Sequence, residues 1–122
     1  MVEATAKNHP ELTGLELSST PPATYECITI AATEAKDLGE RCDKDEFKAL
    51  KAHKPFVEQE ADGFDVTAPL HDAKGRLVGT VGIDFRTKPG QTKAAILKRT
   101  NVVVRELESQ IPSRAFLFQP AP

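Results

Sequence analysis

Residues 63–86 read GFDVTAPLHDAKGRLVGTVGIDFR, and this stretch decides the fold. From Phe64 to His71 apolar and polar residues alternate, which is the pattern of a half-buried strand. Residues 72–75 form a short hairpin loop that ends in the glycine such turns favour. Residues 76–86 then alternate again. The stretch therefore predicts two long antiparallel strands joined by a hairpin.

Each of these strands carries residues that are unusual inside a sheet. Pro69 cannot donate a ladder hydrogen bond, so we expect it at a sheet edge or at a bulge near the strand's end. Gly79 and Gly82 lie in the second strand, which we expect at the centre of the sheet, and glycine weakens a strand on its own. These two glycines would also let something pack closely against the strand, such as a helix or a ligand.

The region before the hairpin predicts two further strands and a loop. Leu15 and Leu17 alternate with polar neighbours, which indicates a half-buried strand that begins near Thr13. Residues 20–24 contain two prolines and are read as a loop. Residues 25–33 are rich in β-branched side chains, so we expect a second strand from Tyr25 to Thr33.

A short helix and a third strand are expected between that region and the hairpin. Asp43 can cap a helix, and Glu46 lies at the spacing of a capping box. Pro55 ends the helix, because the residue before a proline is pushed out of the α region. Residues 56–60 then read as a short strand that turns at residues 61–63.

The last third of the chain predicts one long helix, from Thr92 to about Gln110. Its apolar side recurs every three or four residues, as expected for a helix that packs on a core. The residues of this stripe are Ile96, Thr100, Val103, Leu107 and Ile111. Pro112 ends the helix. In the tail that follows, Phe116 and Phe118 either form a short strand or pin the tail to the body.

Together these elements predict one α+β domain over residues 1–122. We expect an antiparallel sheet of about five strands, one short helix and one long C-terminal helix, with the helices on one face. Residues 1–12 are a polar N-terminal segment or a helix end, and residues 113–122 are a C-terminal tail.

Composition excludes several classes of function. The chain has 122 residues and a formal net charge of -2. Its apolar runs are far shorter than the ~20 residues that a membrane span needs, and residues 1–10 contain no signal peptide. Basic and acidic residues are interleaved without a basic stripe, which argues against a nucleic-acid surface.

Cysteine and histidine are scarce. Cys27 and Cys42 could form one disulfide or remain two free thiols, and the sequence leaves both readings open. The three histidines are scattered and there is no C-x-x-C pair, so no tetrahedral metal set is evident. We therefore predict no metal and no cofactor.

Candidate ligand contacts lie mostly in the hairpin. The Asp84 carboxylate comes late in the glycine-bearing strand and could accept hydrogen bonds from a ligand amine. Asp65 and Thr67 could line the same face, although a solvated outer face is the simpler interpretation. Tyr25, the single tyrosine, could cap a pocket through its hydroxyl or be a half-buried strand residue. His71 has neither a nucleophile nor an orienting group, so no enzymatic activity is predicted.

The 63–86 stretch resembles the terminal hairpin of Cache-type extracytoplasmic sensor domains, which have a PAS-like fold. The matching positions are Asp72, Gly75, Gly79, Gly82 and Asp84. Residues 9–12 resemble the element that ends the N-terminal helix of that family, so the resemblance covers about residues 9–87. The chain departs from the family in lacking most of that helix and in having a strong C-terminal helix instead.

The resemblance implies a sensor for signal transduction, located in the periplasm or outside the cell. Its leading interpretation is a non-enzymatic module that binds a small molecule between the sheet and the short helix, through Asp84, Tyr25, Asp65 and Thr67. The alternative is a structural or interaction module that forms a homodimer through the C-terminal helix and tail. The sequence does not identify the ligand or the oligomeric state.

Overall fold

The computed structural model describes residues 1–86, 88 and 90–119. Its helices are α1 (Val2–Asn8), α2 (Lys44–Ala52) and α3 (Lys93–Glu108), with short 3₁₀ helices at Ala35–Asp37 and Arg114–Phe118. Its strands are β1 (Leu12–Ser19), β2 (Ile28–Ala32), β3 (Phe56–Glu60), β4 (Gly63–His71) and β5 (Leu77–Arg86). No helix in the described part of the chain is long and apolar enough to cross a membrane.

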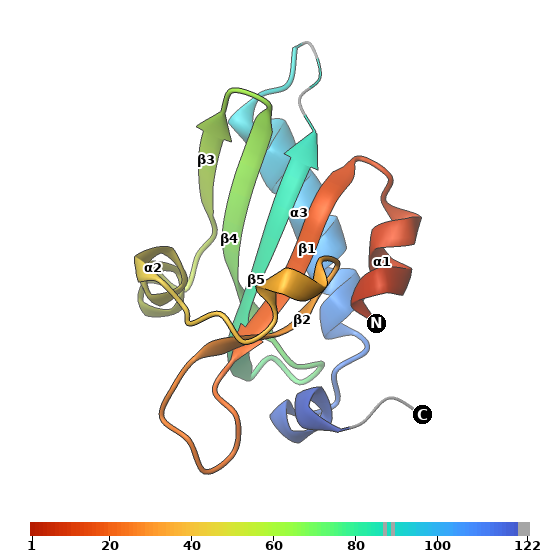
Figure 1. Ribbon diagram of the computed structural model, residues 1–122. Coiled ribbons are helices and arrows are strands. Elements are labelled where there is room, and N and C mark those ends of the chain that lie inside the picture. Colours follow the sequence, from red (N-terminus) through yellow and green to blue (C-terminus); the bar gives the residue numbers. More distant parts are fainter. Residues whose placement is uncertain (87, 89, 120–122) are drawn as a thin grey trace.

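The five strands form one sheet in the order β2-β1-β5-β4-β3. Every pair of neighbours is antiparallel, and β5 lies at the centre, as expected for the second strand of the hairpin. The predicted hairpin of residues 63–86 is confirmed, since β4 and β5 pair from Gly63 with Arg86 to Leu70 with Gly79. Figure 1 shows this hairpin in the middle of the twisted sheet.

Helices cover both faces of the sheet. In Figure 1 α3 runs behind the sheet, with α1 at the right, and α2 lies at the left, below β3. The core lies between α3 and the sheet, and its apolar side chains come from both. Its largest fully buried members are Leu15, Leu17, Val66, Leu70, Val81, Ile83, Phe85, Ile96, Val103, Leu107 and Ile111. The expected arrangement with all helices on one face is wrong, because α2 buries Ala49 completely against the opposite face.

The long helix agrees closely with its prediction. Thr92 caps α3 by accepting a hydrogen bond from Ala95 N at 3.1 Å. The five residues of the predicted apolar stripe are all buried. The capping box at the start of α2 is also confirmed, with Asp43 and Glu46 hydrogen-bonded to each other's backbone N–H groups.

The unusual strand residues have local explanations. Pro69 is tolerated inside the sheet because β3 starts at Phe56, opposite Thr67, and so has no residue paired with Pro69. The register of β4 also shifts just afterwards. A side chain at Gly79 would lie 2.1 Å from the carbonyl oxygen of Ser18, so the backbone of β1, and not a helix or ligand, packs against this glycine.

The two ends of the chain differ from a simple polar segment and a loose tail. Helix α1 buries Val2, and His9 at its end is only 8% exposed. The His9 ring joins α3 through Glu106 at 3.1 Å. In the tail, residues 114–118 form a 3₁₀ helix that packs Leu117 against the core, not a strand.

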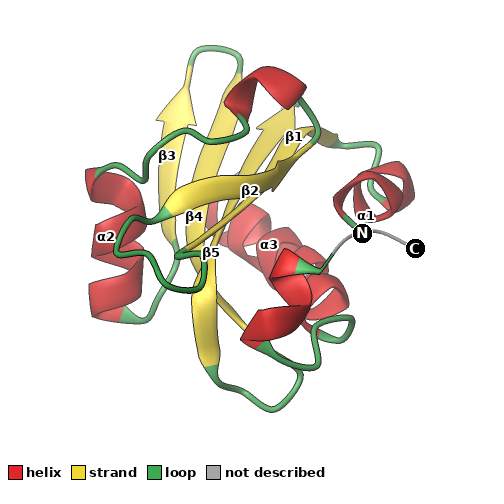
Figure 2. Cartoon of the chain, turned by 60° about the horizontal axis from the view of Figure 1, so that its bottom comes forward, coloured by secondary structure: helices red, strands yellow, loops and turns green. Residues whose placement is uncertain are grey.

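The β1–β2 connection is longer than predicted. Strand β2 begins only at Ile28, so Tyr25 lies in the preceding loop. Cys27 and Cys42 are joined by a disulfide, which resolves the two readings left open by the sequence. Beyond β2, residues 39–42 follow its outer edge, with hydrogen bonds from Thr29 N to Glu40 O and from Cys42 N to Cys27 O. Figure 2 shows how the segment between β2 and α2 curves over this end of the sheet.

Candidate ligand-binding site

The face of the sheet opposite α3 carries mostly polar and small residues, and we call it the polar face. Residues paired directly across antiparallel strands point to the same face, so the register defines its members. They are Gly14, Glu16 and Ser18 of β1, Asp65 and Thr67 of β4, and Thr80, Gly82 and Asp84 of β5. Three of the four predicted ligand contacts therefore lie on one face.

A carboxylate pair lies near the outer end of this face. Asp65 and Asp84 are direct cross-strand partners. Glu60, at the end of β3, is close to both, and one carboxylate oxygen from each of the three residues lies within 4.8 Å of the others. Such an oxygen cluster suits a positively charged group, either an ammonium or a hard cation.

Burial is the main influence on the pKa values of these carboxyl groups. Burial, followed by the charge of Asp84, raises the pKa of Asp65 to about 7. Burial likewise raises the pKa of Asp84. Burial also raises the pKa of Glu16, with Asp37 and Asp84 adding to the effect. Two neighbouring carboxylates cannot both ionise cheaply in such a place, so a cation that replaced the proton would relieve the repulsion.

Two glycines give the acidic side chains room to lie across the sheet. A Cβ atom at Gly14 would lie 2.8 Å from the Asp84 Oδ2 atom. A Cβ atom at Gly82 would lie 2.9 Å from the Glu16 Oε1 atom. The expectation that the glycines allow close packing thus holds at Gly82, but the group that packs there is a side chain of the chain itself.

A cavity of about 200 Å³ opens beside the carboxylate pair, between α2 and strands β3 and β4. Its polar lining comes from both sides of this gap and includes Asp65 and Thr67. The full lining is Asp45, Lys48, Phe56, Val57, Glu58, Asp65 and Thr67. The Lys48 ammonium lies over the Phe56 ring, 4.2 Å from its centre, so a cation–π contact joins these two lining residues.

The surroundings of the polar face are acidic. The connection from β2 to α2 places Asp37 near both Glu16 and Asp84, where its charge raises the pKa of each after burial has done so. The basic residues of that connection pair with other acids: Lys36 with Glu34 at 3.2 Å and Arg41 with Glu26 at 3.2 Å. The acidic groups around Asp65 and Asp84 therefore favour a cation at that end of the polar face, while Lys48 contributes one positive charge to the cavity lining.

The fourth predicted contact is not part of this arrangement. Tyr25 lies in the β1–β2 loop with its side chain 102% exposed, apart from the cavity lining. Sequence reasoning also missed several residues of the site, among them Glu16, Lys48, Phe56 and Glu60. The alternation of β1 would have placed Glu16 on the polar face, but the positions of the other three depend on how α2 and β3 dock.

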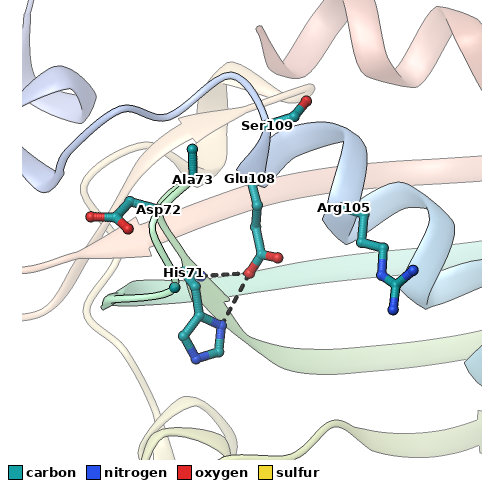
Figure 3. A pocket seen from close by; sticks show the side chains of 7 residues that line it. His71, Asp72, Ala73, Arg105, Glu108 and Ser109 are labelled. Carbon is teal, nitrogen blue, oxygen red and sulfur yellow. Dashed lines mark hydrogen bonds and ion pairs between the residues drawn. The ribbon is translucent and has the colours of Figure 1, made fainter.

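A second, wider groove of about 650 Å³ lies on the other side of the molecule, where α3 ends beside the β4–β5 hairpin. Figure 3 shows His71 turned towards Glu108 and Arg105 turned away from both. Glu108 Oε2 accepts from the backbone N of His71 at 2.7 Å and lies 3.1 Å from its Nδ1. Asp72 pairs instead with Arg76 at 2.7 Å. These polar groups satisfy one another, so the groove offers less to a ligand than the polar face.

Neither a protein-family model nor a curated protein sequence matches the chain. Solved structures do match. One is the repressor BlcR of Agobacterium tumefaciens, with a TM-score of 0.60 and 10% identity over 91% of this chain. Another is the C-terminal domain of the E. coli transcriptional regulator KdgR, with a TM-score of 0.51 and 10% identity. The chain shares its fold with domains of transcriptional regulators.

The extent of the match differs between the two neighbours. The alignment with the KdgR domain covers 92% of this chain and 94% of that domain. It spans only 65% of the BlcR chain, so about a third of that repressor has no counterpart here. At 10% identity the likeness concerns the fold alone.

These neighbours correct three expectations. The assignment to Cache-type extracytoplasmic sensor domains is wrong, because the matching folds belong to regulators of transcription. The periplasmic or extracellular location is wrong with it, since it rested on that resemblance and such regulators act where the DNA is. The exclusion of nucleic acid as a partner is also unsupported, because the matching folds belong to regulators of transcription.

Proposed function

We propose that the chain is a non-enzymatic sensory domain that binds a small, positively charged organic molecule on the polar face, beside α2. The cavity between α2 and strands β3 and β4 is the observation that carries this proposal. Within the α+β class, a PAS-like arrangement, in which one face of the sheet receives the ligand, is part of the same proposal. Domains of regulators with this fold support a role in signal sensing.

The chemistry of the lining sets the ligand class. An ammonium group of the ligand would lie between the Asp65 and Asp84 carboxylates and take the place of the proton they hold. Such charge-assisted hydrogen bonds are about twice as strong as neutral ones. The Phe56 ring supplies an aromatic wall for the organic part, and the Thr67 hydroxyl supplies one further donor or acceptor.

The cavity sets the ligand size. Pockets for drug-sized ligands measure roughly 300–1,000 Å³, whereas this one measures about 200 Å³. It therefore fits a short amine, a diamine or the side-chain end of a basic amino acid. The absence of enzymatic activity remains a prediction for this chain, in agreement with the regulatory role of its structural neighbours.

Thermal unfolding against a panel of compounds tests the proposal. The panel contains short monoamines, 1,4-diaminobutane, arginine, matched carboxylic acids, Ca²⁺ and Mg²⁺. A ligand at one hundred times its Kd adds about 2.7 kcal/mol, which raises the midpoint by several degrees in a domain of this size. We expect an amine to give this shift, and the acids to give none.

Variants locate the binding. Asp65→Asn and Asp84→Asn should each remove most of the shift, whereas Glu3→Gln, which removes a charge from the exposed side of α1, should leave it intact. A shift with the carboxylic acids alone, or one that both Asp variants retain, would refute the proposal. A shift with Ca²⁺ or Mg²⁺ but with no amine would replace the organic ligand by a metal ion.

A further inference from the structure

The disulfide lies at the base of the element that covers the proposed site. Cys27 immediately precedes β2, and Cys42 immediately precedes Asp43, the N-cap of α2. Between the two cysteines the chain forms β2, a 3₁₀ helix and a return segment. The bond therefore joins the edge of the sheet to the start of α2.

The return segment follows β2 through backbone hydrogen bonds. Gly39 N donates to Thr29 O at 2.9 Å, Thr29 N donates to Glu40 O at 2.8 Å, and Cys42 N donates to Cys27 O at 2.9 Å. These bonds are few and lie at a sheet edge, where local opening is easiest. The disulfide is the covalent tie at the end of this segment.

The residues of α2 that line the cavity follow this tie closely. Asp45 comes three positions after Cys42, and Lys48 comes one helical turn later. Among the described residues, no hydrogen bond or ion pair joins a side chain of α2 to the sheet. Helix α2 is held by the buried Ala49, by the Lys48–Phe56 contact and by its connections along the chain. Its N-terminal half therefore depends on the disulfide for its position.

We propose that the Cys27–Cys42 disulfide is a redox-controlled clamp on the ligand site. The oxidised chain holds the start of α2 against β4 and binds the ligand. The reduced chain lets residues 39–48 move and binds it more weakly. This inference rests on the proposed function for its ligand and adds a regulation to the same site.

The redox step requires a dithiol reductant. One thiolate of the reductant attacks a sulfur of the Cys27–Cys42 bond, which breaks to give a mixed disulfide and a cysteine thiolate. The second thiol of the reductant then releases the other cysteine. Two electrons and two protons pass to the chain, and the reductant becomes a disulfide. Both cysteines are half-buried, not enclosed, so a reductant can approach.

The structural neighbours make this chemistry relevant. They are regulators of transcription, and proteins that share a compartment with DNA generally keep their thiols reduced. Disulfides that form there are mostly transient, catalytic or redox-sensing. A disulfide beside a sensory site in this fold is therefore more readily explained as a switch than as a permanent staple.

Hydrogen exchange of the unliganded chain tests the clamp without any ligand. The oxidised chain, the same chain treated with dithiothreitol, and the Cys27→Ser/Cys42→Ser double variant are compared. We expect the amides of residues 43–48 to exchange about tenfold faster in the last two samples, because a lost constraint opens the segment locally. The amides of α3 serve as an internal control and should not change.

Binding of 1,4-diaminobutane to the same three samples tests the coupling. We expect affinity to fall about tenfold, equivalent to about 1.4 kcal/mol, in the reduced chain and the double variant. Equal exchange and equal affinity in all samples would overturn the clamp, as would a disulfide that dithiothreitol does not open while the chain is folded. If no sample binds any amine, the proposed function fails, while the exchange data still decide whether the disulfide controls α2.

Discussion

At the scale of single residues, ionising the Asp65–Asp84 pair costs free energy in the folded chain. Asp65 on β4 is half-buried and Asp84, its partner on β5, is more exposed, and loss of solvation raises the pKa of each. A sheet face with no function could carry serine or threonine at these positions at lower cost, because neutral side chains need no proton there. Groups with perturbed pKa values in a cleft often mark functional sites, which is why this pair anchors the proposal.

The pair makes stability depend on pH in a definite direction. The ordinary pKa of Asp65 is 3.8 and its folded value is about 7. Between these values the folded chain holds a proton that the unfolded chain has lost, so stability falls as pH rises across that window. Below the window both states are protonated and the effect vanishes.

Asp65→Asn tests this directly, since asparagine resembles the protonated acid but cannot ionise. We expect the variant to be more stable than the native chain by about 1–3 kcal/mol near pH 8, and equally stable near pH 4. Urea unfolding at the two pH values measures the difference. Glu3→Gln is the control and should change stability little at either pH. A destabilised Asp65→Asn variant near pH 8 would show that the ionised form is favoured in the fold.

Three of the four candidate residues lie on one face, as strand alternation predicts, and their role as ligand contacts stays a prediction. Asp65 and Thr67 lie two apart on one strand, and Asp84 follows the same alternation on its partner, so a correct hairpin places all three on one face. The strand placement of Tyr25 is wrong, because the loop after Pro21 continues to Cys27 and leaves the tyrosine side chain exposed. The β-branched residues that indicated a strand lie only in the later half of residues 25–33.

At the scale of elements, the two glycines of β5 differ in what an added side chain would meet. At Gly79 it would meet backbone, and at Gly82 it would meet a side chain. At Gly79 an added Cβ would meet the Ser18 carbonyl oxygen at 2.1 Å, and a backbone atom in a central strand cannot move aside. At Gly82 it would meet the end of the Glu16 side chain at 2.9 Å, which can rotate. The same residue type thus has a structural role at one position and a site-shaping role at the other.

This difference gives a matched pair of variants. We expect Gly79→Ala to lose about 2–4 kcal/mol of stability, at or slightly beyond the usual cost of overpacking. Gly82→Ala should lose less than about 1 kcal/mol, while displacing Glu16 and weakening amine binding. Thermal unfolding of both variants checks this. An equal loss in the two would mean that strand propensity, and not the contact with Ser18, sets the cost.

The elements themselves were largely predictable. The capping signals at Asp43 and Thr92, together with a stripe of period 3.6, are local, so α2 and α3 were placed to within a few residues. The side of the sheet that α2 covers was not predictable from the sequence, because it depends on the long connection after β2. Alternation in β4 and β5 reports only that one face is more apolar, and Ala49 is too small a signal to reveal a second packed face.

At the scale of the whole molecule, the C-terminal tail that follows Pro112 packs against the rest of the domain. Leu117 packs against the core, and Arg114 donates a hydrogen bond to the carbonyl oxygen of Thr20. Phe116 is 36% exposed and Phe118 is half-buried. These contacts reduce the apolar surface that the tail could offer to a second copy, which weakens the argument for a homodimer through this segment. The homodimer remains an untested expectation.

Truncation after Pro112 separates a role of the tail in stability from a role in dimerisation. We expect the shortened chain to lose about 1–2 kcal/mol of stability, because burying part of a leucine side chain contributes roughly that much, with no change of oligomeric state. Urea unfolding and light scattering of both chains measure the two quantities. If truncation converted a dimer to a monomer at unchanged stability, the interaction-module alternative would be favoured.

Fold class followed from the sequence, but family did not. The order of strands and helices predicted an α+β domain with a five-stranded antiparallel sheet, which the structure confirms. The glycines at positions 79 and 82 resembled a Cache hairpin, yet each is explained by local packing against Ser18 and Glu16. Steric requirements of a hairpin produce the same short patterns in unrelated sheets. Such a pattern therefore identifies neither the family of a protein nor its cellular location.

The most direct test of the central claim is a map of amide chemical shifts while an amine from the panel is added to the oxidised chain. If the polar face beside α2 is the site, the amides of Lys48, Phe56, Asp65, Thr67 and Asp84 should shift together with one binding curve. Shifts confined to His71, Arg105 and Ser109 would instead assign binding to the groove at the end of α3. No shifts at any concentration would contradict the claim that this domain senses a cationic ligand.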